Sequence, residues 1–152
     1  MSKFKIFFKS ILFPVIVGAA VGFFISDSID YTTLIQPPLA PPSILFPIVW
    51  TILYILMGIS YGILKSKELI DSKINFVYLF QLAINALWSI FFFSLKWRLF
   101  SGVWIILLLF SIVLIIYTFY QKDKTSAYLQ IPYLLWTLFA TYLNWSIYFL
   151  NR

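Results

Sequence analysis

The sequence predicts an all-α integral membrane protein, a single bundle of five transmembrane helices formed by residues 1–152. Hydrophobic residues make up 62% of the chain and charged residues only 11%, which lies outside the range of soluble domains. No segment shows the alternating pattern of an outer-membrane barrel strand, so helices are the remaining spanning structure that satisfies every backbone polar group. Five apolar segments are each long enough to cross a hydrocarbon core of about 30 Å: residues 7–25, 45–64, 74–95, 100–120 and 127–150.

The first segment follows three lysines, Lys3, Lys5 and Lys9, and could be interpreted as a signal peptide. Its apolar run is longer than a usual signal core, and no convincing small-residue cleavage site follows Ile25. We therefore interpret it as the first membrane helix.

Two GxxxG motifs mark places where helices can approach closely. Gly18 and Gly22 form one in the first segment, and Gly58 and Gly62 form another in the second. We expect the second motif to pack within the chain. The first motif leaves open whether two copies of the chain form a homodimer.

The loop between the first two segments is dense in proline and reads PPLAPP from residue 37 to residue 42. Proline fixes φ near about −65° and disfavours helix at the preceding residue, so the loop is predicted to be stiff up to about Ser43. Pro47 is tolerated in the first helical turn. A stiff apolar loop that leads directly to Trp50 predicts a lid over a cavity, with a simple helix stop and start as the alternative.

Basic residues are distributed unequally between the two sides of the predicted bundle. Eight of the eleven lie in the N-terminal tail and in the second and fourth loops. The positive-inside rule therefore predicts a cytoplasmic N-terminus and an external proline-rich loop. The net charge of +6 is explained by this bias and by anionic lipid headgroups, and no basic domain typical of nucleic-acid binding is present.

Ionisable side chains are absent from the predicted spans, because every Asp, Glu, Lys and Arg falls in a loop or at a segment end. Ion pumps and proton-coupled transporters use such groups at membrane depth. The chain has no His and no Cys, which argues against a metal centre, thiol chemistry and a Ser–His pair. Met57 and the tyrosines are the only residues left as axial ligands for haem iron.

Three segments carry a helix face that combines tryptophan with small or amide residues. The faces are Trp50, Tyr54, Met57 and Tyr61; Gln81, Asn85, Trp88 and Phe92; and Trp136, Ala140, Leu143 and Asn144. Together they predict a pocket with flat aromatic walls for a large, planar, apolar ligand with a few polar substituents. In the alternative interpretation, Asn85 and Asn144 only hydrogen-bond across helices. Trp97, Trp104 and Trp145 are predicted to be interfacial or packing residues.

These residues together resemble the translocator protein family, also called tryptophan-rich sensory proteins or peripheral benzodiazepine receptors. The resemblance covers nearly the whole chain. It is carried by the PPxAPP loop leading into FPIVWTILYILMG (46–58), by QLAINALWS (81–89), and by YLLWT (133–137) followed by Ala140, Leu143 and Asn144.

The resemblance implies a bacterial multi-pass protein of the cell membrane whose pocket accepts porphyrins, haem, sterols and benzodiazepine-type or isoquinoline-carboxamide ligands, with no required cofactor or metal. The implied ligand-binding positions are Pro41, Pro42, Phe46, Trp50, Tyr54, Asn85, Trp88, Trp136, Ala140, Leu143 and Asn144. Trp50 and Trp136 match a pair implicated in light-dependent porphyrin breakdown, which leaves an enzymatic role open. Transport of porphyrin or lipid is the other alternative. Leu39 stands where relatives commonly have Trp, so ligand selectivity is expected to differ.

Overall fold

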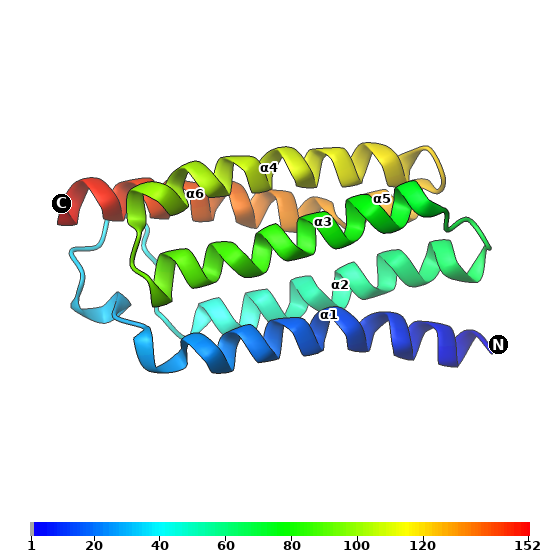
Figure 1. Ribbon diagram of the computed structural model, residues 1–152, viewed down its shortest axis with the longest axis horizontal. Helices are drawn as coiled ribbons and strands as arrows, with labels where there is room; N and C mark the ends of the chain where they lie inside the picture. The colour runs from blue at the N-terminus through cyan, green and yellow to red at the C-terminus, as the bar shows by residue number, and fades with distance from the viewer. Residues whose placement is uncertain (1) are drawn as a thin grey trace.

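The computed structural model describes residues 2–152, and within that range every regular element is helical. Five long helices run up and down along one axis, with the two chain ends at opposite ends of the bundle (Figure 1). The elements are α1 (Lys3–Ile25), the 3-10 turns η1 (Ser26–Ser28) and η2 (Tyr31–Thr33), α2 (Leu45–Ser66), α3 (Ser72–Ser89), the π-helical turn η3 (Ile90–Ser94), α4 (Arg98–Tyr120), α5 (Lys124–Tyr128) and α6 (Ile131–Asn151).

Four of the long helices, α1 to α4, are long and apolar enough to cross a membrane. Their outward surfaces carry large exposed apolar side chains such as Phe23, Phe76 and Phe110. This arrangement confirms the all-helical class and the multi-pass membrane character predicted from composition. The fifth long helix, α6, has 21 residues and packs along α4.

The predicted continuous helix over residues 127–150 is wrong at its beginning. The structure has a short helix, α5, then a turn at Leu129 and Gln130, and only then α6. Pro132 lies in the first turn of α6, where its missing N–H costs nothing, whereas a continuous helix would place the proline ring against the carbonyl of Tyr128.

The third predicted segment also differs near its end, because the α-helix stops at Ser89 and continues as the π-helical turn η3. The wider turn reorients the next residues, and both Phe92 and Phe93 become buried. Turns of this kind occur frequently at functional sites.

The second GxxxG motif packs α2 against α1 within the chain, as predicted. A Cβ atom built on Gly58 would clash with the Cα of Ile11, and one built on Gly62 would lie 2.7 Å from the ring of Phe7. In the first motif, Gly18 accommodates the ring of Tyr54, whereas Gly22 faces open space. The α1–α2 pair therefore depends on small residues from both helices.

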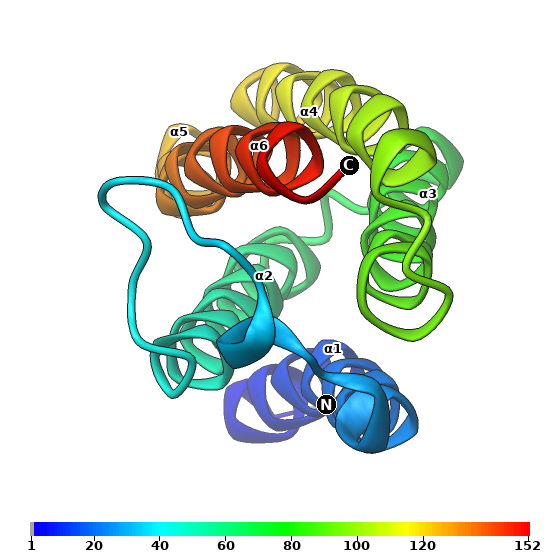
Figure 2. The ribbon, with the colours of Figure 1, turned by 90° about the vertical axis from the view of Figure 1, so that its left-hand side faces the viewer.

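The first loop crosses the end of the bundle, passes beside α6 and returns to α2 (Figure 2). The side chain of Asn151 exchanges two hydrogen bonds of 2.9 Å with the backbone of Ile35, and the hydroxyl of Tyr142 donates to the carbonyl of Pro38. Leu39 has a φ of 71° at the third position of a turn closed by the N–H of Ala40, a place that favours glycine. The predicted lid is thus held to α6 by three hydrogen bonds at two loop residues, Ile35 and Pro38.

At the opposite end, Asp71 and Asp123 cap α3 and α5 and pair with lysines from other loops. The N–H of Ile74 and the ammonium of Lys122 lower the pKa of Asp71; the ammonium of Lys67, followed by the N–H of Ser126, lowers the pKa of Asp123. Because both pKa values fall below the unfolded value of about 3.9, these carboxylates stabilise the fold above that pH. Their contribution is lost as the pH falls through the folded pKa values.

We therefore expect the unfolding temperature of the detergent-solubilised protein to decline below about pH 4. An Asp71→Asn/Asp123→Asn variant keeps side chains that can cap helices but cannot ionise, so its decline should be shallower. Thermal unfolding at pH 6, 5, 4 and 3 measures both curves. Parallel curves would contradict the assignment of acid sensitivity to these two caps.

Candidate ligand-binding site

The three predicted tryptophan faces meet around the side chain of Trp50. Its ring centroid lies 6.2 Å from that of Trp88 on α3, and 6.4 Å and 6.5 Å from those of Tyr133 and Trp136 on α6. The two indoles of Trp50 and Trp136 are nearly perpendicular, at 86°. Such edge-to-face arrangements are favourable for aromatic rings at these separations. One aromatic cluster therefore joins α2, α3 and α6.

The first loop contacts this cluster through Tyr31, whose ring packs on that of Phe46 in the first turn of α2. Their rings lie 5.0 Å apart, and the ring of Phe46 lies 5.9 Å from that of Trp136. Tyr31 is only 2% exposed, and its hydroxyl donates a 2.8 Å hydrogen bond to the carbonyl of Pro41. The carbonyl of Pro42 accepts from the N–H of Leu45, where α2 begins. The two prolines thus position the loop through their carbonyl groups.

Between α3, α6 and the loop, the predicted pocket is filled by its own side chains. Only a void of about 10 Å³ remains. Its walls include five of the predicted positions, Phe46, Trp88, Ala140, Leu143 and Asn144. These residues converge as predicted, but a planar ligand can enter only if side chains move.

A larger cavity of about 300 Å³ lies on the other side of Trp50, against α1. Trp50, Tyr54 and Phe46 line it together with Gly22 of α1 and Phe93 of η3. Phe46 and Phe93 also line the small void, so these two rings separate the two spaces. The volume is at the lower end of the range of ligand pockets, which is about 300–1,000 Å³.

Trp136 lies with one side on the aromatic cluster and the other on a shallow groove of about 410 Å³ between α2 and α6. Its indole N–H is buried and has no hydrogen-bond partner among the described residues. A buried donor without a partner costs free energy. A ligand that places an acceptor beside this indole would therefore gain a favourable hydrogen bond from it.

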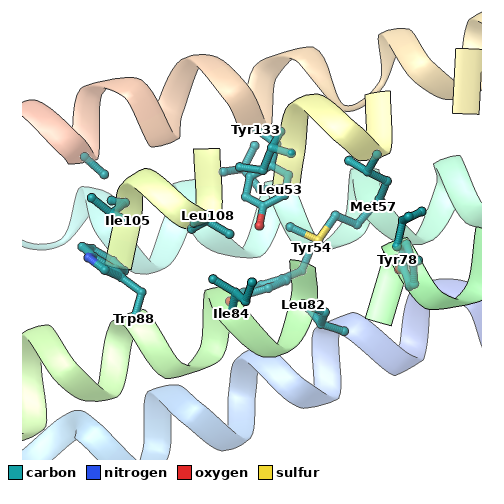
Figure 3. Close-up of a cluster of buried hydrophobic side chains, with 14 of the residues drawn as sticks. Leu53, Tyr54, Met57, Tyr78, Leu82, Ile84, Trp88, Ile105, Leu108 and Tyr133 are labelled. Atoms are coloured by element: carbon teal, nitrogen blue, oxygen red, sulfur yellow. The ribbon is translucent and has the colours of Figure 1, made fainter. Parts of the chain in front are cut away.

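Asn85, about one turn before Trp88 in α3, is the centre of a buried hydrogen-bond network. Its amide oxygen accepts from the hydroxyl of Tyr54 at 2.7 Å, and its amide nitrogen donates to the hydroxyl of Tyr133 at 2.8 Å. Tyr133 in turn donates to the amide oxygen of Gln81 at 2.8 Å. Figure 3 shows Tyr54 and Tyr133 in the buried cluster, with Trp88 and Tyr78 at its two ends. The network ties α2, α3 and α6 together.

A second polar chain leads from the site to the first loop. The indole of Trp88 donates to the amide oxygen of Asn144 at 2.9 Å, and the amide of Asn144 donates to the carbonyl of Arg98 at 2.8 Å. The guanidinium of Arg98 pairs with Asp30 in the loop at 2.6 Å. Asn85 and Asn144 therefore both make the cross-helix bonds expected in the alternative interpretation.

Two of the other three tryptophans, Trp104 and Trp145, pack between helices, which is one of the two roles predicted for them. The indoles of Trp104 and Trp145 donate to the carbonyls of Ile84 and Gly102 on neighbouring helices. Trp97 is about half exposed, at the start of α4.

Three contributions to the site were missed by sequence reasoning. Tyr133 shares a helix face with Ala140 and Asn144, so the helical spacing could have identified it. Tyr31 lies in the short 3-10 turn η2 of the first loop. The side of the larger cavity that α1 forms consists of small and aliphatic residues. Neither of these features carries a periodic signal in the sequence. Their places depend on tertiary packing.

The chain matches the model of the TspO/MBR family over residues 10–150. It is 40% identical over 145 residues to the tryptophan-rich protein TspO of Archaeoglobus fulgidus, covering 93% of this chain and 94% of that protein. It is also 40% identical over 124 residues to the tryptophan-rich protein TspO of Chlorobaculum tepidum (80% and 78% covered). A tryptophan-rich sensory protein of Cereibacter sphaeroides is 32% identical over 134 residues (88% and 84%). Family model and relatives, together with the aromatic cluster at the loop end, show that this chain belongs to the TspO/MBR family.

Proposed function

We propose that the protein is a membrane receptor or sensor that binds a tetrapyrrole, with protoporphyrin IX or haem as its ligand, at the aromatic cluster around Trp50. The observation that carries the proposal is the meeting of Trp50, Trp88 and Trp136 beside an apolar cavity under the first loop. Flat aromatic walls without ionisable groups suit a planar apolar macrocycle. Benzodiazepine-type and isoquinoline-carboxamide ligands share this chemistry, and no resident cofactor is needed.

In this proposal the ligand enters the cavity of about 300 Å³ first and then displaces Phe46. Phe46 lines both spaces and lies in the first turn of α2, next to the loop, so its movement joins the cavity to the void beside Trp88. The Asp30–Arg98 ion pair and the Tyr31 hydrogen bond hold the loop over this region. Loop residues act here as a lid whose position depends on the ligand.

The protein is further proposed to cross the bacterial cell membrane five times, with α6 as the fifth span and the N-terminus in the cytoplasm. The length of α6 and its exposed Leu135, Leu138 and Phe149 support a spanning helix. Eight of the eleven basic residues lie at the end of the bundle that carries the N-terminus, which supports this orientation.

Titration of the purified protein with protoporphyrin IX should quench its tryptophan fluorescence in a saturable way. A Trp50→Phe/Trp136→Phe variant keeps aromatic bulk but removes the indole that lines the cavity and the indole that packs edge-to-face against it, and we expect a loss of affinity together with reduced quenching. Unchanged quenching in this variant would refute the assignment.

Gly22 offers a matched pair of variants for the entry cavity, because a Cβ atom there meets nothing within 4 Å. Gly22→Leu places bulk in the cavity and should weaken porphyrin binding, whereas Gly22→Ala should bind as the native protein does. Equal affinities for all three proteins would place the porphyrin elsewhere.

A second candidate function is light-dependent porphyrin degradation, favoured by the perpendicular contact between Trp50 and Trp136. In this reaction an indole would give an electron to the illuminated macrocycle and take one back, and dissolved dioxygen would be the net oxidant that ring breakdown requires. Illumination should then remove the porphyrin absorption band faster with the native protein than with detergent alone or with the double tryptophan variant. Equal rates would exclude this function. Porphyrin or lipid transport has less support, since the sequence contains no visible inverted repeat.

A further inference from the structure

A second large cavity lies at the opposite end of the bundle from the first loop. Its volume is about 610 Å³, within the range of ligand pockets. Three helices supply its walls: Lys9 and Phe13 from α1, Tyr61 and Lys65 from α2, and Asn75, Tyr78 and Leu79 from α3, among others. The tetrapyrrole site has no residue in common with it.

Two lysines give this cavity an uncompensated positive charge. Neither Lys9 nor Lys65 forms an ion pair among residues 2–152. The carboxylates of Asp71 and Asp123, at the same end of the bundle, are each paired with another lysine. Glu68, in the loop after α2, neither lines the cavity nor pairs with Lys9 or Lys65 among the described residues. An anion of suitable shape would therefore complete the site.

The remaining walls are apolar and partly open to the surrounding bilayer. Phe13 and Leu79 are each about half exposed, on the outward surfaces of α1 and α3. Deeper in the wall, Tyr78 is only 3% exposed, and its hydroxyl has no hydrogen-bond partner within residues 2–152. The hydroxyl of Tyr61 donates to the amide oxygen of Asn75 at 2.6 Å and so links the α2 and α3 walls of the cavity. The cavity combines cations with an apolar surface that an acyl chain can reach from the membrane.

We propose that this cavity binds an anionic phospholipid, with the phosphate between Lys9 and Lys65 and one acyl chain against Phe13 and Leu79. Basic pockets between membrane helices bind anionic headgroups in this way. A soluble anion would use only the lysines and leave the apolar walls without a partner. The lipid would join α1 to α3, two helices that make far less direct contact with each other than α1 makes with α2.

Native mass spectrometry of the detergent-purified full chain tests the proposal. The probes are phosphatidylglycerol and phosphatidylcholine with identical acyl chains. We expect the native protein to retain one phosphatidylglycerol in preference to phosphatidylcholine. Each lysine near an anionic group is worth about fivefold in affinity, so a Lys9→Gln/Lys65→Gln variant should bind roughly 25-fold more weakly.

A Lys3→Gln/Lys73→Gln variant is the matched control, because it removes the same charge from the same end of the bundle but neither residue lines the cavity. It should retain phosphatidylglycerol as the native protein does. A Leu79→Trp variant keeps both lysines and fills the apolar wall, and it should also lose the lipid.

Three results would overturn the proposal. The first is equal retention of the two lipids by the native protein, and the second is an equal loss in both lysine pairs. The third is displacement of the lipid by inorganic phosphate, or by protoporphyrin IX in the Trp50→Phe/Trp136→Phe background, which would assign the cavity to that ligand. Loss of porphyrin binding at Trp50 would leave this lipid site unaffected.

Discussion

Gly58→Ala is expected to destabilise the protein by about 1–3 kcal/mol, the usual cost of overpacking a close contact. The added methyl group would clash with the backbone Cα of Ile11 and lie 2.7 Å from the carbonyl oxygen of Ser10. A backbone contact cannot be relieved by a change of rotamer, so α1 and α2 must separate. The clash must also offset the roughly 1 kcal/mol by which alanine is favoured over glycine inside a helix.

The sequence of α1 explains why its backbone is so close to α2 at this point. Pro14 lies inside α1 and has no N–H, so the carbonyl of Ser10, four residues earlier, lacks its helical hydrogen bond. That carbonyl is one of the atoms that face Gly58. Only a residue without a side chain lets the two backbones approach this closely.

Gly22→Ala is the matched control for Gly58→Ala, because it makes the same substitution in a membrane helix where the new methyl group meets no neighbour within 4 Å. Its unfolding temperature in detergent should equal or exceed that of the native protein, whereas that of Gly58→Ala should fall by several degrees. Equal unfolding temperatures for the two variants would show that the α1–α2 contact does not limit stability.

The sequence predicted the helical class and most helix positions because hydropathy over twenty residues is a strong signal that does not depend on tertiary contacts. The interruption before α6 was missed, and the structure places Pro132 in the first turn of α6. Apolar composition alone does not separate a continuous helix from two helices joined by a two-residue turn. The π-helical turn at η3 likewise has no distinct compositional signal.

The residues of the candidate site were predicted more completely than the shape of its pocket. Helical spacing placed Trp50, Trp88 and Trp136 on inward faces, and the structure brings them together. Spacing carries no information on how far apart the faces lie, so the nearly closed void beside Trp88 was not foreseen. The cavity-lining residues of α1 could not be predicted, because they are aliphatic like the residues that face lipid.

Disruption of the hydrogen-bond network around Asn85 is the second change that we expect to destabilise the protein strongly. An Asn85→Leu variant leaves the hydroxyl of Tyr54 without an acceptor and removes the donor to Tyr133, although Tyr133 still donates to Gln81. A buried polar group left unpaired costs about 1–3 kcal/mol, so we expect a destabilisation of that size in reversible unfolding in detergent. Tyr54→Phe alone should cost less, because it leaves only one amide oxygen unpaired.

The double variant Tyr54→Phe/Asn85→Leu distinguishes a structural role of Asn85 from a ligand contact. Replacing both partners by apolar groups is nearly neutral, so the double variant should be more stable than the sum of the two single effects allows. If Asn85 serves only to hold Tyr54 and Tyr133, porphyrin affinity should recover together with stability. Recovered stability with an affinity well below that of Tyr54→Phe alone would instead place the amide of Asn85 against the ligand, because Tyr54 itself lines the cavity. Strictly additive losses would contradict the network, because two groups that share one hydrogen bond of 2.7 Å cannot act independently.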